Sequence, residues 1–152
     1  MDNVADEVLK QKVIGVLSRE HLMALATVRH DGFPQTTWVN YINDGLTLYF
    51  ACDAASQKAG NLARDPKVSL AIACETKNFN QLKGLSMSGR AIRIKDRSRA
   101  ATILQRLFHK LPQSRRYTPD DPTSLAVFEV TPVAVSLIDY SQGFGHDQLI
   151  LM

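Results

Sequence analysis

The chain has 152 residues, of which 45% are hydrophobic and 22% are charged, a composition typical of one folded globular domain rather than of a disordered chain. No apolar run is long enough to cross a bilayer, and the acidic start of the chain is unlike a signal peptide. The formal net charge is a modest +3, and neither Cys52 nor Cys74 belongs to a CxxC motif, so we expect free, reduced thiols. We therefore expect one cytoplasmic domain over residues 1–152, without a membrane partner.

The first third of the chain predicts one helix and three strands. Apolar residues recur at helical spacing over residues 4–17, which indicates an amphipathic helix. The predicted strands are residues 22–29, 35–42 and 46–51. Each of the two turns that join them contains Asp-Gly, which favours a tight hairpin. These three strands should therefore form an antiparallel meander.

The rest of the chain predicts two further helices and three further strands. The helices are residues 57–64, which Asp65-Pro66 should end, and residues 96–111. The strands are residues 68–74, 85–94 and 125–139, the last bent near Pro132. The apolar tail should dock, with a partner subunit as one place for it. Six strands and three helices favour a β-barrel, because closure removes exposed strand edges, and a sheet with edge-covering helices is the alternative.

The segment after the third strand has the features of an anion site. The predicted helix begins after Ser56, and Lys58 lies in its first turn. A helix N-terminus offers unpaired backbone N–H groups and partial positive charge, which suit an anion. A lysine there opposes the helix dipole, so its presence is easier to understand if a phosphate lies between them. The segment by itself is only suggestive of a phosphate site.

Half of all lysines and arginines lie between Arg90 and Arg116, with Asp96 as the single acid among them. Most such runs are solvated faces, and that interpretation is favoured here. An anion-attracting surface for a phosphorylated ligand is the alternative. Nucleic-acid binding is not favoured, because aromatic stacking residues are not interleaved with the basic ones.

Several short motifs follow one another over roughly residues 20–140. In chain order they are Ala26-Thr27-Val28, Asp31-Gly32-Phe33-Pro34, Leu48-Tyr49-Phe50, Ser56-Gln57-Lys58, Asn61-Leu62, Asp65-Pro66-Lys67-Val68-Ser69-Leu70 and Gly89-Arg90-Ala91. No single motif is specific, but their order and spacing resemble the pyridoxamine 5'-phosphate oxidase-like family of FMN-binding split barrels.

This resemblance implies a mainly β fold, a six-stranded split barrel with flanking helices, that forms a homodimer and holds two FMN molecules at the subunit interface. It implies that Lys58 and Ser56 bind the FMN phosphate, with Gln57 beside them. The residues it implies along the ribityl chain and the isoalloxazine ring are Thr36, Thr37, Trp38, Ala51, Cys52 and Asp53. A place in the core is the alternative for Trp38, and packing is favoured over reactivity for Cys52.

The chain departs from pyridoxamine-phosphate oxidase itself. Gln35-Thr36-Thr37 stands where that enzyme has arginine, and residues 141–147 lack its substrate-binding arginine and tryptophan. The chain therefore looks closer to the general-stress members of the family, and we expect an FMN-dependent oxidoreductase with an unassigned substrate. The flavin carries the electron chemistry, so no catalytic side chain is named.

Two alternatives stay open. One is a flavin-binding or stress protein without turnover, and the other is the same barrel with haem or a deazaflavin. Haem would need an axial histidine near the barrel mouth, for which only His146 is available. The four histidines show no metal-ligand spacing, so no metal site is expected.

Overall fold

The structure, a computed structural model, describes residues 4–152, without the side chains of Tyr117 and Pro122. The helices are α1 (Val4–Arg19), α2 (Gln57–Arg64) and α3 (Arg97–Lys110). The strands are β1 (Leu22–Val28), β2 (Pro34–Asn40), β3 (Ile42–Asp44), β4 (Thr47–Asp53), β5 (Lys67–Ala73), β6 (Lys83–Arg93), β7 (Leu125–Asp139) and β8 (Asp147–Leu151). Two short 3₁₀ segments, Pro112–Tyr117 and Pro122–Ser124, connect α3 to β7.

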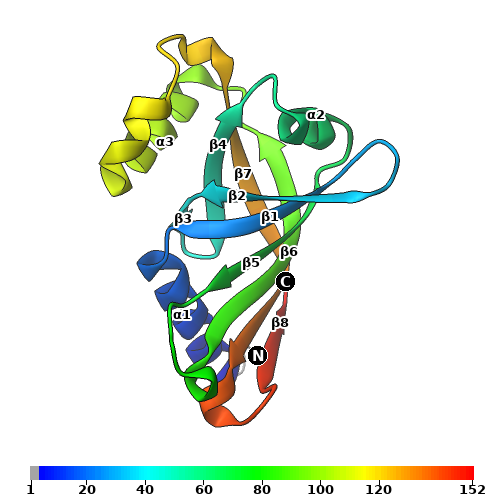
Figure 1. The fold of residues 1–152 in the computed structure, drawn as a ribbon, viewed down its shortest axis with the longest axis vertical. Coiled ribbons are helices and arrows are strands. Elements are labelled where there is room, and N and C mark those ends of the chain that lie inside the picture. Colours follow the sequence, from blue (N-terminus) through cyan, green and yellow to red (C-terminus); the bar gives the residue numbers. More distant parts are fainter. Residues whose placement is uncertain (1–3) are drawn as a thin grey trace.

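The strands form one curled antiparallel sheet in the order β2-β1-β5-β6-β7-β4-β3, and β8 pairs with β7 (Figure 1). The strands at the two ends of this order, β2 and β3, are consecutive in the chain and are separated by Tyr41 alone. At Tyr41 the chain stops pairing with β1 and begins to pair with β4. This change of partner connects the two ends of the strand order and closes the sheet on itself. The Tyr41 side chain is fully buried, and its hydroxyl donates a hydrogen bond to the Leu17 carbonyl at the end of α1, 2.8 Å away.

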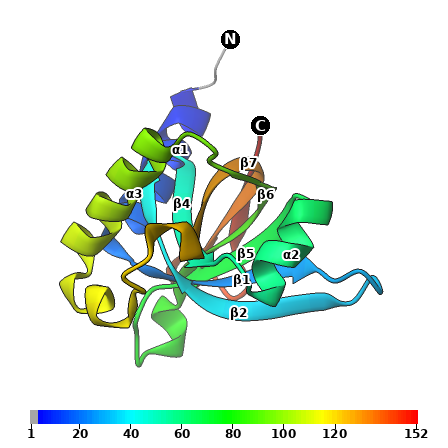
Figure 2. The ribbon, with the colours of Figure 1, turned by 90° about the horizontal axis from the view of Figure 1, so that it is seen from above.

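The core fills the inside of the curled sheet and is covered at one end by α1, which lies beside β3, β6 and β8. Phe50 of β4 and Phe128 of β7 stack at its centre, with their rings 5.2 Å apart. A second apolar cluster lies outside the sheet, where α3 packs its buried Ile103 and Leu107 on β4 and β7. Figure 2 shows α2 and α3 on either side of the end of β4. This end of the barrel carries the candidate site.

The expected fold class is confirmed: a mainly β, split-barrel architecture with three flanking helices. The six expected strands are β1, β2, β4, β5, β6 and β7, and the structure adds two short ones. The predicted strand over residues 35–42 is divided into β2 and β3 because it changes partner at Tyr41. The bend expected near Pro132 is a β-bulge, since Gly89 pairs with Pro132 and its neighbour Ser88 with Ala134.

The apolar tail does dock, and it does so on its own chain. Residues 147–151 form β8, which pairs with β7 along residues 134–138. The edge of the sheet supplies the hydrogen-bond partners that the tail needs. Within residues 4–152, no helix is both long enough and apolar enough to cross a membrane.

Candidate functional site

The start of α2 is fixed by two side chains that precede it. The Ser56 hydroxyl accepts a hydrogen bond from the Ala59 N–H (3.2 Å), and so caps the helix as predicted. The Asp53 carboxylate accepts from the Ala55 N–H (2.8 Å), which holds the turn between β4 and α2. The backbone N–H groups of Gln57 and Lys58, the first two of the helix, have no hydrogen-bond acceptor among residues 4–152.

A cavity of about 410 Å³ lies beside this turn, and we refer to it as the Lys58 cavity. Five predicted site residues line it together, namely Trp38, Ala51, Cys52, Asp53 and Lys58. The remaining wall comes from β2, α3, the 3₁₀ region and β7, with Val39, Asn40, Leu104, Leu107, Phe108, Leu111, Ser114, Thr118, Pro119 and Leu125. Its size and its mixed lining, in which apolar side chains surround the charged residues Lys58 and Asp53, are typical of a small-molecule site.

Lys58 is half-buried, and burial lowers the pKa of its ammonium group below the usual value. In the described part of the chain no carboxylate forms an ion pair with it. Burying a cation without a counter-ion is costly, so the site is better matched to a bound anion than to an empty state. The donor set, one ammonium and two unpaired backbone N–H groups, fits a phosphate.

Cys52 lies against the same group. Burial raises the pKa of its thiol, and a hydrogen bond with Ser56 and the charges of Lys58 and Arg93 oppose that rise without cancelling it. The thiol is therefore held protonated, as expected of a packing residue rather than of a nucleophile. This agrees with the interpretation of Cys52 from sequence.

The residues predicted on β2 point in two directions. Trp38 is 72% exposed, so its interpretation as a core aromatic is wrong, although it does line the Lys58 cavity. Thr36 is also exposed. Thr37 faces the other way, and its buried hydroxyl has no hydrogen-bond partner among the described residues. Neither threonine lines the cavity. Strand alternation places Thr37 on the opposite face from Trp38, whereas Thr36 shares the face of Trp38 but lies outside the cavity wall.

Gln57 also lies apart from the cavity wall. Its carbonyl accepts from the Gln35 amide (3.0 Å), and Gln35 in turn accepts from Asn61 (3.1 Å). Buried Asn61 also donates to Thr27 (3.0 Å). This polar chain ties α2 to β1 and β2, and so fixes the position of the helix that carries Lys58.

The sequence did not predict the contribution of α3. The sequence predicts a helix here and names none of its residues as site residues, and of its apolar side chains only Ile103 and Leu107 are buried against the sheet. Leu104 and Phe108 lie beside them and line the cavity. The signal was present, because the stripe is wider than the single buried face needs.

Metal and haem ligands are not assembled here. None of the four histidines, all of which are described, lines the Lys58 cavity. Among the residues that the structure describes, no group of three or more His, Cys, Asp or Glu side chains could hold a metal ion. His146 lies next to Asp139 at the start of β8, away from α2 (Figure 1).

A curled antiparallel sheet closed by one chain segment defines a split barrel, and the Lys58 cavity lies beside the turn from β4 into α2. The sequence profile described as pyridoxamine 5'-phosphate oxidase matches residues 9–139, and the chain belongs to this family. The chain is also 26% identical to General stress protein 26 from Bacillus subtilis over 135 residues, which covers 86% of this chain and 89% of that protein.

Solved structures share the fold. General Stress Protein 26 from Bacillus anthracis superposes with a TM-score of 0.70 at 18% identity, covering 95% of this chain and 98% of that one. A FAD-binding protein from Mesorhizobium loti gives a TM-score of 0.70 at 18% identity over 84% and 91% of the two chains. A heme binding protein from Mycobacterium smegmatis gives 0.75 at 19% identity over 93% of this chain and 56% of that one. Proteins of this fold therefore differ in the group they bind.

Proposed function

We propose that the protein binds FMN in the Lys58 cavity and acts as an FMN-dependent oxidoreductase on a substrate that is still unassigned. The observation that carries the proposal is the half-buried Lys58, which has no ion-pair partner in the described chain and lines a cavity with apolar walls from α3. Membership of the family and the flavin-binding neighbour support a flavin over other anions. The absence of histidine from the cavity wall favours flavin over haem.

Each part of the site has a distinct role in this proposal. Lys58 and the free N–H groups at the start of α2 hold the phosphate, while Ser56 acts mainly by fixing the start of the helix. Ala51, Cys52 and Asp53 lie along the ribityl chain and ring, with Gln57, Thr36 and Thr37 at the edge of the site. The apolar wall from α3 excludes water from the ring. The flavin supplies the electron chemistry, so no side chain is assigned a catalytic role.

The proposal includes a homodimer with FMN at its interface. Trp38 supports it, because a large aromatic side chain that is 72% exposed on the edge strand β2 is suited to burial against a second subunit. Replacement by alanine should leave the unfolding free energy of the free chain almost unchanged but should shift the sedimentation coefficient towards a monomer and weaken FMN binding. A dimer of unchanged strength in Trp38→Ala would remove Trp38 from the interface. The proposed location is the cytoplasm.

Titration of the flavin-free protein with FMN tests the site. Lys58→Ala should weaken FMN binding by about 10- to 100-fold, because a charge-assisted contact with phosphate is lost. Lys67→Ala is the matched control, since Lys67 is an exposed lysine at the start of β5, outside the cavity, and its replacement should change nothing. Equal FMN affinity in both variants would remove Lys58 from the phosphate site.

Reduction of the bound flavin separates an enzyme from a binding protein. Loss of the yellow colour on anaerobic addition of NADH or NADPH is expected of an oxidoreductase. A flavin that stays oxidised with both donors would favour the alternative of a flavin-binding stress protein without turnover. Tight binding of haem or of a deazaflavin, with no binding of FMN, would refute the cofactor assignment.

A further inference from the structure

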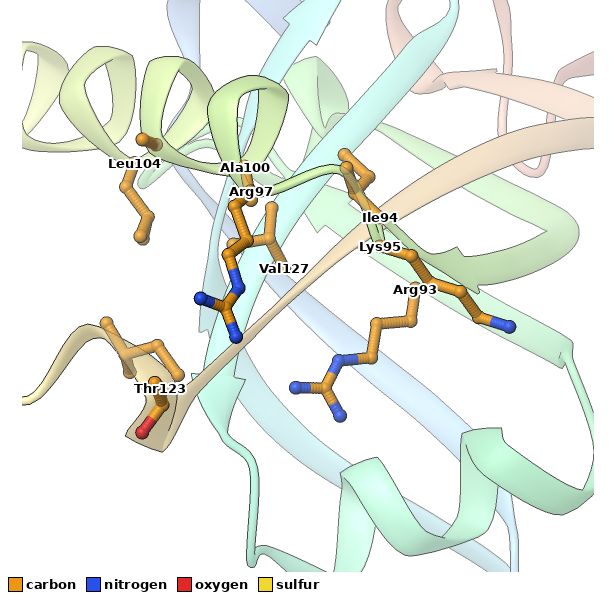
Figure 3. A pocket seen from close by; sticks show the side chains of 10 residues that line it. Arg93, Ile94, Lys95, Arg97, Ala100, Leu104, Thr123 and Val127 are labelled. Atoms are coloured by element: carbon orange, nitrogen blue, oxygen red, sulfur yellow. The ribbon is translucent and has the colours of Figure 1, made fainter.

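A second cavity lies beside the first turns of α3. Its volume is about 600 Å³, and we refer to it as the α3 cavity (Figure 3). It is bounded by the end of β6, the first half of α3 and the start of β7. Its lining residues are Arg93, Ile94, Lys95, Arg97, Ala100, Ala101, Leu104, Thr123, Leu125 and Val127.

The cations of this cavity differ from three other basic residues of the 90–116 stretch, namely Arg99, Arg106 and Lys110. Arg99 pairs with Glu129, Arg106 pairs with Asp44 (2.7 Å), and Lys110 donates to the Glu20 carbonyl. Arg93 and Arg97, in contrast, have no acidic partner among residues 4–152. The stretch is therefore mixed: Arg99, Arg106 and Lys110 hold the fold together, Arg93, Lys95 and Arg97 line the α3 cavity, and Arg90, Arg115 and Arg116 lie outside it without an acidic partner among the described residues.

The geometry of these two arginines suits an extended anion. Figure 3 shows the guanidinium group of Arg97 directed into the space between α3 and Thr123, that of Arg93 extending away from α3 on the other side of β7, and Lys95 pointing away from this space. Guanidinium groups bind phosphate through paired hydrogen bonds, whereas the Thr123 hydroxyl already donates to the Asp121 carboxylate (2.8 Å). The apolar side chains of Ala100, Leu104 and Val127 form the opposite part of the lining. A bare phosphate would contact only the cations and would leave the apolar lining uncovered. We therefore expect a ligand that also carries an apolar or aromatic group.

The α3 cavity adjoins the Lys58 cavity. Leu104 and Leu125 line both cavities. Leu125 pairs with Asp53 at the end of β4, and the Ala54 N–H donates to the Ser124 carbonyl (2.8 Å), so one wall borders the turn into α2. A molecule longer than FMN could therefore occupy both cavities.

We propose that the α3 cavity binds the adenosine-diphosphate end of a dinucleotide whose other end reaches the Lys58 cavity. The diphosphate lies against Arg93 and Arg97, and the adenine ring lies on the apolar wall. This inference rests on the proposed flavin site. The dinucleotide is either a flavin dinucleotide or the nicotinamide dinucleotide that reduces the flavin, and both share the same diphosphate and adenosine.

ADP is the probe that tests the cavity on its own. We expect ADP to bind the flavin-free protein, and the double variant Arg93→Gln/Arg97→Gln to weaken that binding by about 10- to 100-fold. Arg90→Gln is the matched control, because Arg90 is an exposed arginine of the same strand outside the cavity, and it should bind ADP normally. Calorimetry measures binding, and circular dichroism shows that each variant is folded.

Three results would overturn the inference. The first is that the native chain does not bind ADP. The second is that the double variant binds ADP as tightly as the native chain. The third is that Lys58→Ala loses ADP binding while the double variant keeps it, which would place ADP in the Lys58 cavity. FMN binding without ADP binding would refute the α3 cavity and leave the flavin site intact. ADP binding that depends on Arg93 and Arg97, without any FMN binding, would refute the flavin site and with it the bridging dinucleotide.

The two sources of the dinucleotide give different results. If the source is a flavin dinucleotide, FAD should bind more tightly than FMN, and the double variant should abolish the difference. If the source is the reductant, FAD and FMN should bind equally, and NADH should reduce the flavin faster than reduced nicotinamide mononucleotide does. That advantage should disappear in the double variant. If neither of these two patterns is observed, the proposal is refuted.

Discussion

Two half-buried lysines, Lys58 in the first turn of α2 and Lys110 at the end of α3, show how similar burial can serve different functions. Burial lowers the pKa of both Lys58 and Lys110. The Lys110 ammonium group donates to the Glu20 carbonyl (2.7 Å) and lies 4.7 Å from the centre of the Tyr41 ring. Lys58 makes no such contact with any described side chain or carbonyl group.

This difference separates a structural cation from a binding one. A half-buried charge that already has a carbonyl and an aromatic face gains nothing from a ligand. A half-buried charge without partners carries a desolvation cost that a bound anion would offset. Lys110 therefore belongs to the fold, and Lys58 to the site.

The surroundings follow the same division. Tyr41 is completely buried where the chain crosses from β2 to β3, and its hydroxyl is satisfied by Leu17. Trp38, only three residues earlier, is mostly exposed. Trp38 in β2 is therefore exposed to solvent, whereas Tyr41, at the point where β2 ends and the barrel closes, is part of the core.

The largest effect should come from removing the closure residue. Tyr41→Ala should lower the free energy of unfolding by about 3–5 kcal/mol, because a large buried ring is lost. Tyr41→Phe keeps the ring and should cost only about 1 kcal/mol for the hydrogen bond to Leu17. Urea denaturation measures both values. A loss below 1 kcal/mol in Tyr41→Ala would mean that closure at this residue does not stabilise the barrel.

Replacing each lysine by methionine should show that Lys110 contributes to the free energy of unfolding and Lys58 to FMN affinity. Lys110→Met should lower the free energy of unfolding by about 1–2 kcal/mol and leave FMN affinity unchanged, since a hydrogen bond and a cation–π contact are lost. Lys58→Met should leave the unfolding free energy unchanged or slightly raise it, because an unpaired charge is no longer desolvated. Denaturation and FMN titration of the same two samples measure this. The comparison fails if both variants lose stability equally.

Local chemistry made much of the fold predictable. Asp31-Gly32 and Asp44-Gly45 form the turns expected of them, and both glycines adopt positive φ angles of 85° and 57°. The Ser56 cap and the end of α2 at Asp65 also follow from neighbouring residues alone. These features depend on interactions over a few residues, which a sequence displays directly.

Features that depend on distant pairing were not predictable in the same way. The division of one predicted strand at Tyr41 arises because its two halves pair with β1 and β4, far apart in the chain. The role of Leu104 and Phe108 depends on where α3 lies relative to β2 and β4, and hydrophobic periodicity does not encode this. The separation of paired from unpaired arginines likewise needs the positions of Asp44 and Glu129.

The smallest expected effect is a pH dependence of FMN binding that Lys58 causes and Lys110 does not. The pKa of Lys58 is lowered from 10.5 in the FMN-free protein, and a bound phosphate should raise it again. FMN affinity should therefore fall by about threefold as the pH rises from 7.5 to 10, because more of the ammonium is neutral before binding.

For the same reason, the flavin-free folded state binds fewer protons than the unfolded chain between the lowered pKa and 10.5. Lys58 therefore makes the unfolding free energy rise with pH in that range. Lys58→Arg keeps its charge throughout, so it should abolish the fall in FMN affinity and weaken the rise in unfolding free energy, to which Lys110 also contributes. Lys110→Met should keep the fall in FMN affinity. If Lys58→Arg loses FMN affinity as steeply as the native chain, the titrating group is not Lys58, and the contrast between the two lysines does not extend to the ligand.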